Sequence, residues 1–326
     1  MKATAVAGSN IALIKYWGNR DDALRLPHNN SISLTLDKAS TTTTVQFTDA
    51  LNTDEITINS RMVVGPARDR VTRHLDHLRR RFGCKLAARV ASENNFPMAS
   101  GIASSASAFA ALTVAAAGAL GHSPAPADLS ALARLGSGSA SRSILGGYVE
   151  WLAADKHEGS YAVQIAGPDH WQIIDVIAVL SSGEKRVKST EGHQTAHTSP
   201  LYPGRLAHVE TQIPRLREAI LRRDFTTLGQ IAELDALSMH AVMMTSQPSL
   251  FYWAPATLTL IEATRTWREE SVEVYFTIDA GPNVHLLTLP EHLEALKARL
   301  QPVTEVERLI VCGPGQGARL IPEHLF

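Results

Sequence analysis

The first third of the chain alternates hydrophobic and polar residues in the manner of β-strands. Ile32, Leu34 and Leu36 share one face of the segment SISLTL, since side chains two positions apart point to the same side of a strand. A β-branched run, TTTTVQF, follows at 41–47. The same signals predict further strands at 55–59, 85–92, 148–153, 161–166 and 172–181.

Helices are predicted where apolar residues recur at intervals of three and four. Val71, Leu75 and Leu78 have this spacing and predict an amphipathic helix over 69–81. A long alanine-rich helix is expected from about 102 to 120. In the second half, helices are predicted at 202–222, 224–245, 254–269 and 291–300, with strands at 272–278, 284–288 and 308–312. The pattern therefore predicts an α/β chain with more helix in its second half.

The composition is that of a globular enzyme with one large or two closely packed domains. The chain has 326 residues, 44% of them hydrophobic, which is enough to bury a core. We divide it at residue 183, into units of 1–182 and 183–326. Because no Pro/Gly/Ser linker separates them, we expect the two units to share an interface.

Charge and cysteine content exclude several classes of protein. A net charge of −1 creates no global field that would favour nucleic acid or an anionic membrane. Two cysteines give neither a disulfide framework nor a zinc-binding pattern, which favours a reducing compartment. The N-terminus has no signal-peptide pattern, and the apolar stretch 106–120 is too short to cross about 30 Å of hydrocarbon. We therefore expect a cytoplasmic protein.

The segment FPMASGIASSASAFAAL, at 96–112, is the strongest candidate for a phosphate site. Small residues lead directly into a helix, whose first turn offers free N–H groups and the positive end of the helix dipole to an anion. The segment is neither GxxxxGK[ST] nor GxGxxG, and an ordinary capped helix packed on a sheet would also fit it. The candidate residues are Pro97, Ser100, Gly101, Ala103, Ser104 and Ser105.

Two further segments combine hydroxyl groups with a cation. GSGSASRS, at 136–143, contains Ser137, Ser139 and Arg142, and an arginine fork suits a carboxylate or phosphate. KRVKSTEGH, at 185–193, contains Lys188, Ser189, Thr190 and His193. Taken alone, the first could equally be a Ser/Gly surface loop and the second a charged loop.

Two short motifs could supply reacting groups. NIALIKYWGN, which begins at Asn10, places Lys15 and Tyr16 after an apolar run, although such a lysine could also snorkel to solvent. TIDAGPN, at 277–283, places Asp279 where a strand ends beside a tight turn. A carboxylate in that position suits a catalytic base, but it also suits a cap of the turn.

Taken in order, these segments resemble the mevalonate diphosphate decarboxylase and phosphomevalonate decarboxylase family of the GHMP kinase superfamily. The resemblance rests on NIALIKYWG, FPMASGIASSAS, GSGSASRSILGGYVEW, KSTEGH, MHAVMM and FTIDAGPN, and it spans nearly the whole chain. It implies an α/β (α+β), GHMP-kinase-like fold of two lobes with the active site in the cleft between them. It also implies a homodimer, as in many members.

The resemblance further implies a reaction and the roles of residues in it. ATP with Mg²⁺ would phosphorylate the tertiary 3-hydroxyl of a 5-phosphorylated mevalonate, after which phosphate and CO2 leave and an alkene forms. Asp279, Lys15 and Arg142 match the family's catalytic residues, with Asn10 holding Arg142. The phosphate loop that ends in Ser104 and Ser105 would bind ATP, and no metal ligand is identified. The substrate-binding set is Asn10, Tyr16, Asn19, Ser137, Ser139, Arg142, Lys188, Ser189, Thr190 and His193.

Two departures from the family's pattern concern the substrate's tail. Asn19 stands where the family has a lysine that holds the terminal phosphate, and His193 stands where methionine is common. Losing a cation weakens the binding of a diphosphate more than that of a monophosphate, although Lys188 could restore the charge. The sequence therefore favours 5-phosphomevalonate as substrate and isopentenyl phosphate as product. The alternatives are the diphosphate reaction, which gives isopentenyl diphosphate, and a mevalonate 3-kinase that releases no CO2.

Overall fold

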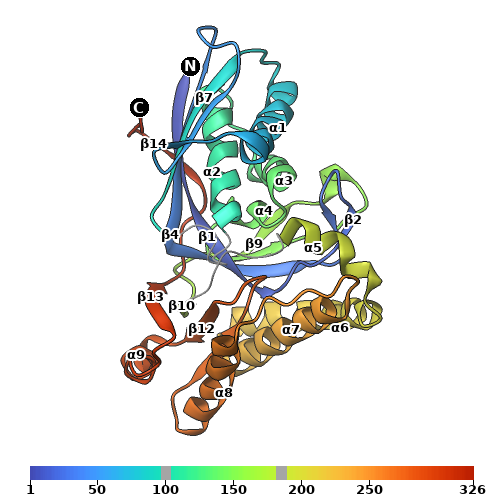
Figure 1. The fold of residues 1–326 in the computed structure, drawn as a ribbon, viewed down its shortest axis with the longest axis vertical. Helices are drawn as coiled ribbons and strands as arrows, with labels where there is room; N and C mark the ends of the chain where they lie inside the picture. The colour runs from blue at the N-terminus through green and yellow to red at the C-terminus, as the bar shows by residue number, and fades with distance from the viewer. Residues whose placement is uncertain (97–103, 181–188) are drawn as a thin grey trace.

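The computed structural model describes residues 1–96, 104–180 and 189–326, and within them the strands form two main sheets (Figure 1). The larger sheet has the order β14-β1-β4-β7-β5-β6, and β8 and β9 extend it from β4. All its pairs are antiparallel except β5 with β7. Its strands are β1 (Lys2–Ile14), β4 (Ser31–Thr48), β5 (Glu55–Ile58), β6 (Arg61–Met62), β7 (Ala87–Asn94), β8 (Tyr148–Trp151), β9 (Ala162–Ala166) and β14 (Arg319–Ile321).

The second sheet is antiparallel, in the order β11-β12-β10-β13, and a small hairpin, β2 with β3, stands apart. Figure 1 shows the second sheet beside the lower end of β1 and β4. The bounds of these strands are β10 (Ile174–Leu180), β11 (Val274–Thr277), β12 (Val284–Thr288), β13 (Val306–Cys312), β2 (Asn19–Asp21) and β3 (Leu26–Pro27).

Helices cover both sheets. Figure 1 shows α1 to α4 grouped at the larger sheet, and α6 and α7 side by side below it with α8 beyond them. The described helices are α1 (Gly65–Phe82), α2 (Ser104–Ala119), α3 (Pro126–Gly136), α4 (Ala140–Ser143), α5 (Ser189–Thr195), α6 (Tyr202–Arg222), α7 (Phe225–Thr245), α8 (Pro255–Glu269) and α9 (Leu293–Leu300). Single 3₁₀ turns lie at 157–159, 196–198 and 290–292.

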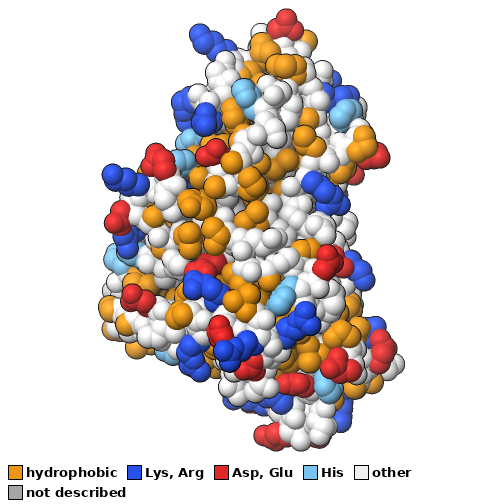
Figure 2. Space-filling model, turned by 180° about the vertical axis from the view of Figure 1, so that it is seen from behind, with side chains coloured by type: hydrophobic (Ala, Val, Ile, Leu, Met, Phe, Trp, Pro, Cys, Tyr) orange, Lys and Arg blue, Asp and Glu red, His pale blue; other side chains and the backbone are white. Residues whose placement is uncertain are grey.

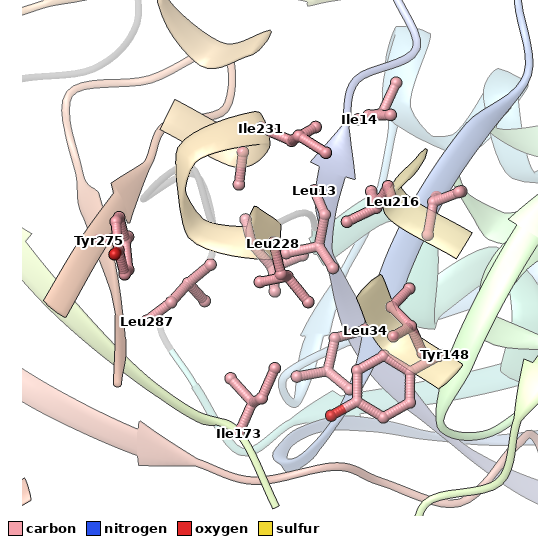
Figure 3. Packing of buried hydrophobic residues seen from close by; sticks show 14 of the residues in the cluster. Leu13, Ile14, Leu34, Tyr148, Ile173, Leu216, Leu228, Ile231, Tyr275 and Leu287 are labelled. Atoms are coloured by element: carbon pink, nitrogen blue, oxygen red, sulfur yellow. The ribbon is translucent and has the colours of Figure 1, made fainter. Parts of the chain in front are cut away.

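The largest hydrophobic cluster joins the two sheets through α6 and α7. It combines Leu13 of β1, Leu34 of β4, Leu216 of α6, Leu228 of α7 and Leu287 of β12, all almost completely buried. Figure 3 shows these side chains converging from the sheets and helices. Burial of apolar surface stabilises a fold by about 25 cal/mol for each Å² removed from water. Burial of this cluster therefore holds the two sheets together.

The structure confirms most of the expected elements and extends several of them. The two strands expected at 32–36 and 41–47 form one continuous strand, β4. The helix expected at 69–81 is α1, in which Leu75 and Leu78 are buried as expected and Val71 is half-buried. The sequence analysis did not predict β1, α3 or α5.

The division expected at 182–183 falls outside the described residues. The strand before it, β10, already belongs to the second sheet, whereas β14, near the C-terminus, returns to pair with β1 of the larger sheet. Each sheet is therefore built from separate stretches of the chain.

Acidic and basic side chains are interspersed on the face in Figure 2, as the near-zero net charge leads one to expect. Among the described helices, none is long and apolar enough to cross a membrane.

Candidate active site

An ion pair between Lys15 and Asp279 lies where the two sheets meet. Lys15 follows β1 and Asp279 follows β11. The Lys15 Nζ donates to Asp279 Oδ1 at 2.7 Å and to the Ala12 carbonyl at 2.7 Å. The Lys15 side chain is 2% exposed and that of Asp279 is 24% exposed. Snorkelling is therefore the wrong interpretation of Lys15, and the carboxylate it contacts remains open to a ligand.

The charges around Asp279 keep its carboxylate ionised. Burial opposes ionisation, but the charges of Lys15 and His285 and the hydrogen bond from Lys15 together hold the pKa of Asp279 below its usual range. The carboxylate is thus available as a base, or as an orienting charge, at neutral pH.

The backbone of Lys15 is fixed by two helices. Its N–H donates to Asp235 Oδ2 of α7 at 2.7 Å, and Arg205 of α6 forms a buried ion pair with Asp235 at 3.1 Å. Asn29 Nδ2 also donates to the Lys15 carbonyl, at 3.1 Å. His240 of α7 contacts the Asp279 carbonyl through Nε2 at 3.2 Å, and burial lowers the pKa of its ring to about 3.

Arg142 is a buried cation that has no ion-pair partner among the described side chains. It is 3% exposed, and its Nη1 donates to Ser31 Oγ at 2.6 Å while its Nη2 donates to Asn10 Oδ1 at 3.1 Å. Its Nε is buried with no described partner. Burial lowers its pKa to about 10, against the opposing effect of the Asp279 carboxylate. The expectation that Asn10 holds Arg142 is confirmed, and the guanidinium has donors left for an anion.

Tyr16, Asn19 and His193 lie together beside this centre. The rings of Tyr16 and His193 stack with centroids 4.2 Å apart, and the Tyr16 hydroxyl donates to Asn19 Oδ1. The Gly18 N–H donates to Nδ1 of His193 at 3.0 Å. Burial and the charge of Arg25 lower the pKa of His193 to about 3. This histidine is therefore a neutral ring at physiological pH.

A row of hydroxyls runs from the start of α2 towards Arg142. Ser105 Oγ lies 3.0 Å from Ser137 Oγ, which lies 3.3 Å from Ser139 Oγ, and Ser139 precedes α4. Ser104 and Ser105 are the first described residues of α2, which was expected to begin at about residue 102. The other residues expected in the phosphate loop, and Lys188, lie outside the described residues. So do the side chains of Ser189 and Thr190, whose backbone begins α5.

A largely apolar pocket of about 450 Å³ opens beside the start of α2. Ile56 and Ile58 of β5 and Phe109 of α2 contribute apolar walls, and Ser104 and Ser105 contribute hydroxyls.

A buried lysine paired with a partly exposed aspartate, an arginine without an ion-pair partner among the described side chains, and hydroxyl groups at the start of a helix beside an apolar pocket define an enzyme site for anionic substrates on a GHMP-type fold. The chain belongs to the diphosphomevalonate decarboxylase family. Residues 7–162 match the model of the diphosphomevalonate decarboxylase-like N-terminal domain. Residues 175–313 match that of the mevalonate 5-diphosphate decarboxylase C-terminal domain.

Individual relatives agree with this assignment. A diphosphomevalonate decarboxylase of Aspergillus fumigatus is 38% identical, over 93% of this chain and 82% of its own. A phosphomevalonate decarboxylase of Haloferax volcanii is 33% identical, over 91% of each chain.

Solved structures of such enzymes superpose closely. The mevalonate diphosphate decarboxylase of Enterococcus faecalis is 37% identical with a TM-score of 0.92, over 98% of this chain and 99% of its own. A structure described as MDDEF in complex with MVAPP, AMPPCP and magnesium is 38% identical with a TM-score of 0.94, over the same shares of the two chains.

The structure brings together most of the residues that the sequence singled out, but it adds the pair Arg205 and Asp235. These two residues lie 30 positions apart on different helices. The signal that could have revealed them is a charged residue on the buried face of each helix, because a buried charge requires a partner.

Proposed function

We propose that the chain phosphorylates the 3-hydroxyl of a 5-phosphorylated mevalonate with ATP and then releases phosphate and CO2 to form an alkene. The observation that carries this proposal is Arg142. It is buried, held by Asn10 and Ser31, and close enough to Asp279 for the carboxylate to affect its pKa. A kinase does not act on the carboxylate of its substrate, whereas a decarboxylase must hold and orient the carboxylate that leaves as CO2.

In this proposal the reacting groups act as follows. Asp279 accepts or orients the proton of the 3-hydroxyl, and Lys15 keeps that carboxylate charged and offsets charge on the transferred phosphoryl group. Arg142 binds the substrate carboxylate through donors not used by Asn10 and Ser31. The apolar pocket suits the adenine base, with its phosphates at the start of α2.

The residues present fit a magnesium ion held mainly by phosphates. The described residues contain no group of three or more His, Cys, Asp or Glu side chains that could chelate a metal. Mg²⁺ in nucleotide sites keeps several waters and takes few protein ligands besides phosphate oxygens. The Ser104 and Ser105 hydroxyls, beside the pocket for the nucleotide, could provide such a ligand. When bound, the ion neutralises charge on the nucleotide phosphates.

For the tail of the substrate we propose the 5-diphosphate. Asn19 led the sequence analysis to favour the monophosphate, and the name of the Haloferax volcanii relative supports that second candidate. However, Asn19 shares its cavity with Arg25, Arg70 and Arg73, so the surroundings are not short of positive charge. The names of the Aspergillus fumigatus and Enterococcus faecalis relatives also favour the diphosphate.

A homodimer and a cytoplasmic location remain part of the proposal. Light scattering coupled to size-exclusion chromatography would test the dimer, which requires a mass of about twice the 35.3 kDa of the chain. Cell fractionation would test the location.

The deciding experiment offers mevalonate, its 5-phosphate and its 5-diphosphate separately, with ATP and Mg²⁺, and measures trapped CO2 and released ADP. The proposal predicts that CO2 and ADP appear in equal amounts and fastest with the 5-diphosphate. ADP without CO2 would identify a 3-kinase. No ADP with any of the three would refute enzymatic phosphorylation of these substrates.

A further inference from the structure

Three arginines surround a cavity beside the active site and have no ion-pair partner among the described residues. Arg25, Arg70 and Arg73 line a space of about 290 Å³ together with Asn19. The ion pairs of the described chain include none of the three. The carboxylate of Asp22 lines the same cavity, but it accepts a hydrogen bond of 2.7 Å from Asn19 Nδ2.

Two of the arginines are held in place by the C-terminal end of α3. Arg25 Nε donates to the Leu135 carbonyl at 3.1 Å, and Arg70 Nη2 donates to the Gly136 carbonyl at 3.1 Å. The last carbonyls of a helix lack partners within it and carry partial negative charge. They orient the guanidinium groups without neutralising them.

The arrangement is electrostatically unfavourable for the Arg70 guanidinium. Its Nε is buried with no described partner, and its guanidinium lies 4.7 Å from the centre of the Phe109 ring. Burial, followed by the charges of Arg25 and Arg73, lowers its pKa to about 10. Gathering three cations around one cavity is unfavourable unless an anion binds among them.

The position of Arg25 indicates which anion this is. Arg25 and Asn19 belong to the same β2–β3 hairpin, in which Asn19 pairs with Pro27. Arg25 is also close enough to act on two neighbouring rings. Its charge adds to burial in lowering the pKa of His193, and it partly offsets the burial that raises the pKa of Tyr16. Tyr16 links this cavity to the active site. Its hydroxyl donates a hydrogen bond to Asn19, and its ring packs against Gly138, which precedes α4.

We propose that Arg25, supported by Arg70 and Arg73, binds the terminal phosphate of the substrate's tail and supplies the cation that Asn19 cannot. This inference rests on the proposed function, since it requires a phosphorylated mevalonate in the centre. With Asp22 as the one carboxylate on the described wall, the cavity carries a net charge of about +2 when its histidines are neutral. A terminal phosphate dianion matches that charge.

A second source of phosphate is close by. The three arginines also line the apolar pocket proposed for the nucleotide, together with Glu191. The test must therefore separate the tail of the substrate from the phosphates of ATP.

The test compares Arg25→Gln, Arg25→Lys and the double variant Arg25→Gln/Asn19→Lys, with Arg265→Gln, an exposed arginine of α8, as the matched control. The kcat/KM for the 5-diphosphate should fall about 10- to 100-fold in Arg25→Gln and much less for the 5-monophosphate. Arg25→Lys should retain part of the preference, and Asn19→Lys should restore it. The KM for ATP should be unchanged, as should every constant of the control.

Two kinetic outcomes would overturn the proposal. Equal losses with both substrates would reflect general electrostatics, and a raised KM for ATP with unchanged selectivity would assign the arginines to the nucleotide.

A binding measurement separates this inference from the proposed function. Calorimetry of inorganic pyrophosphate, with AMPPCP already bound, should show affinity about tenfold weaker or more for Arg25→Gln than for the unaltered chain. Equal affinities would refute the arginine site even if the chain releases CO2. Weaker binding by a chain that releases no CO2 would refute the proposed reaction while the anion site stands.

Discussion

The backbone N–H of Lys15 donates a hydrogen bond of 2.7 Å to Oδ2 of Asp235, which lies 220 residues further along the chain. Asp235 in turn forms a buried ion pair with Arg205, whose guanidinium also reaches the Lys15 carbonyl at 3.4 Å. Helices α6 and α7 thus fix the segment that carries the Lys15 side chain to Asp279. The position of a reacting group is set by charges that do not themselves react.

Asp235→Asn should destabilise the fold strongly. The change leaves the Arg205 charge buried without a counter-ion, which typically costs about 3–5 kcal/mol. Urea unfolding would measure the loss of free energy of unfolding. The matched control is Glu218→Gln, which removes an exposed ion pair with Arg222 and should cost less than about 1 kcal/mol. If the free energy of unfolding fell by similar amounts in the two variants, the buried pair would contribute no more to stability than the exposed one.

Local patterns sufficed to predict most strands and helices, because burial on one face imposes a period of two or 3.6 residues. They failed for β1, which is buried along most of its length and therefore does not alternate. They also failed for α3, a short helix in a stretch where no hydrophobic stripe was recognised.

Some residues of the candidate site could be predicted from the sequence and others could not. The sequence identified Lys15, Asp279, Arg142 and Asn10 through the family resemblance, and the structure brings the four together. It did not identify Arg25, because the contribution of that side chain depends on how the β2–β3 hairpin lies against the end of α3. Neighbours that are distant in sequence leave no local pattern.

Arg142→Lys should impair use of the substrate without affecting the nucleotide. An ammonium group cannot replace a planar fork that binds Asn10, Ser31 and a carboxylate together. We expect a higher KM for the phosphorylated mevalonate, a lower kcat and little change in the KM for ATP, all from steady-state kinetics. Loss of ATP affinity with substrate affinity intact would place Arg142 on the nucleotide side.

Gly138→Ala should disturb the tail pocket through the Tyr16 ring. A Cβ at this position would lie 2.5 Å from Cε1 of Tyr16 and 3.0 Å from the Trp151 ring, so the ring must shift. We expect kcat/KM for the phosphorylated mevalonate to fall by about 10- to 100-fold. In the control Gly204→Ala, the new Cβ has no described atom within 4 Å, and kinetics should be unchanged. Unaltered kinetics in Gly138→Ala would show that the Tyr16 position is not needed.

The pH dependence of stability should depend on His74. Burial lowers its pKa to about 3 in the folded chain, against about 6.5 when unfolded. Between these values the unfolded state binds the extra proton, so the free energy of unfolding decreases as the pH falls from about 6.5 to 3, by up to about 1.4 kcal/mol per pH unit. Stability is unaffected by this group above about pH 7.5.

His74→Leu removes this contribution and leaves Thr113 bonded to the Phe109 carbonyl. Urea unfolding at pH 5, 6 and 8 should show a flatter decrease towards acid than in the unaltered chain. An identical slope in both would mean that His74 does not remain neutral in the folded state.

The central claim is that the charged Asp279, paired with Lys15, accepts or orients the proton of the substrate's 3-hydroxyl. The variant Asp279→Asn tests this claim most directly. The amide keeps the shape of the side chain and removes its charge, so the variant should still fold, with some loss of stability because the buried Lys15 loses its counter-ion. The kcat for CO2 release from the 5-diphosphate should fall by about 10²- to 10⁴-fold, with thermal unfolding as the check on folding. A folded variant that releases CO2 within about threefold of the unaltered rate would contradict the account. Asp279 would then be only a cap of the turn that follows β11.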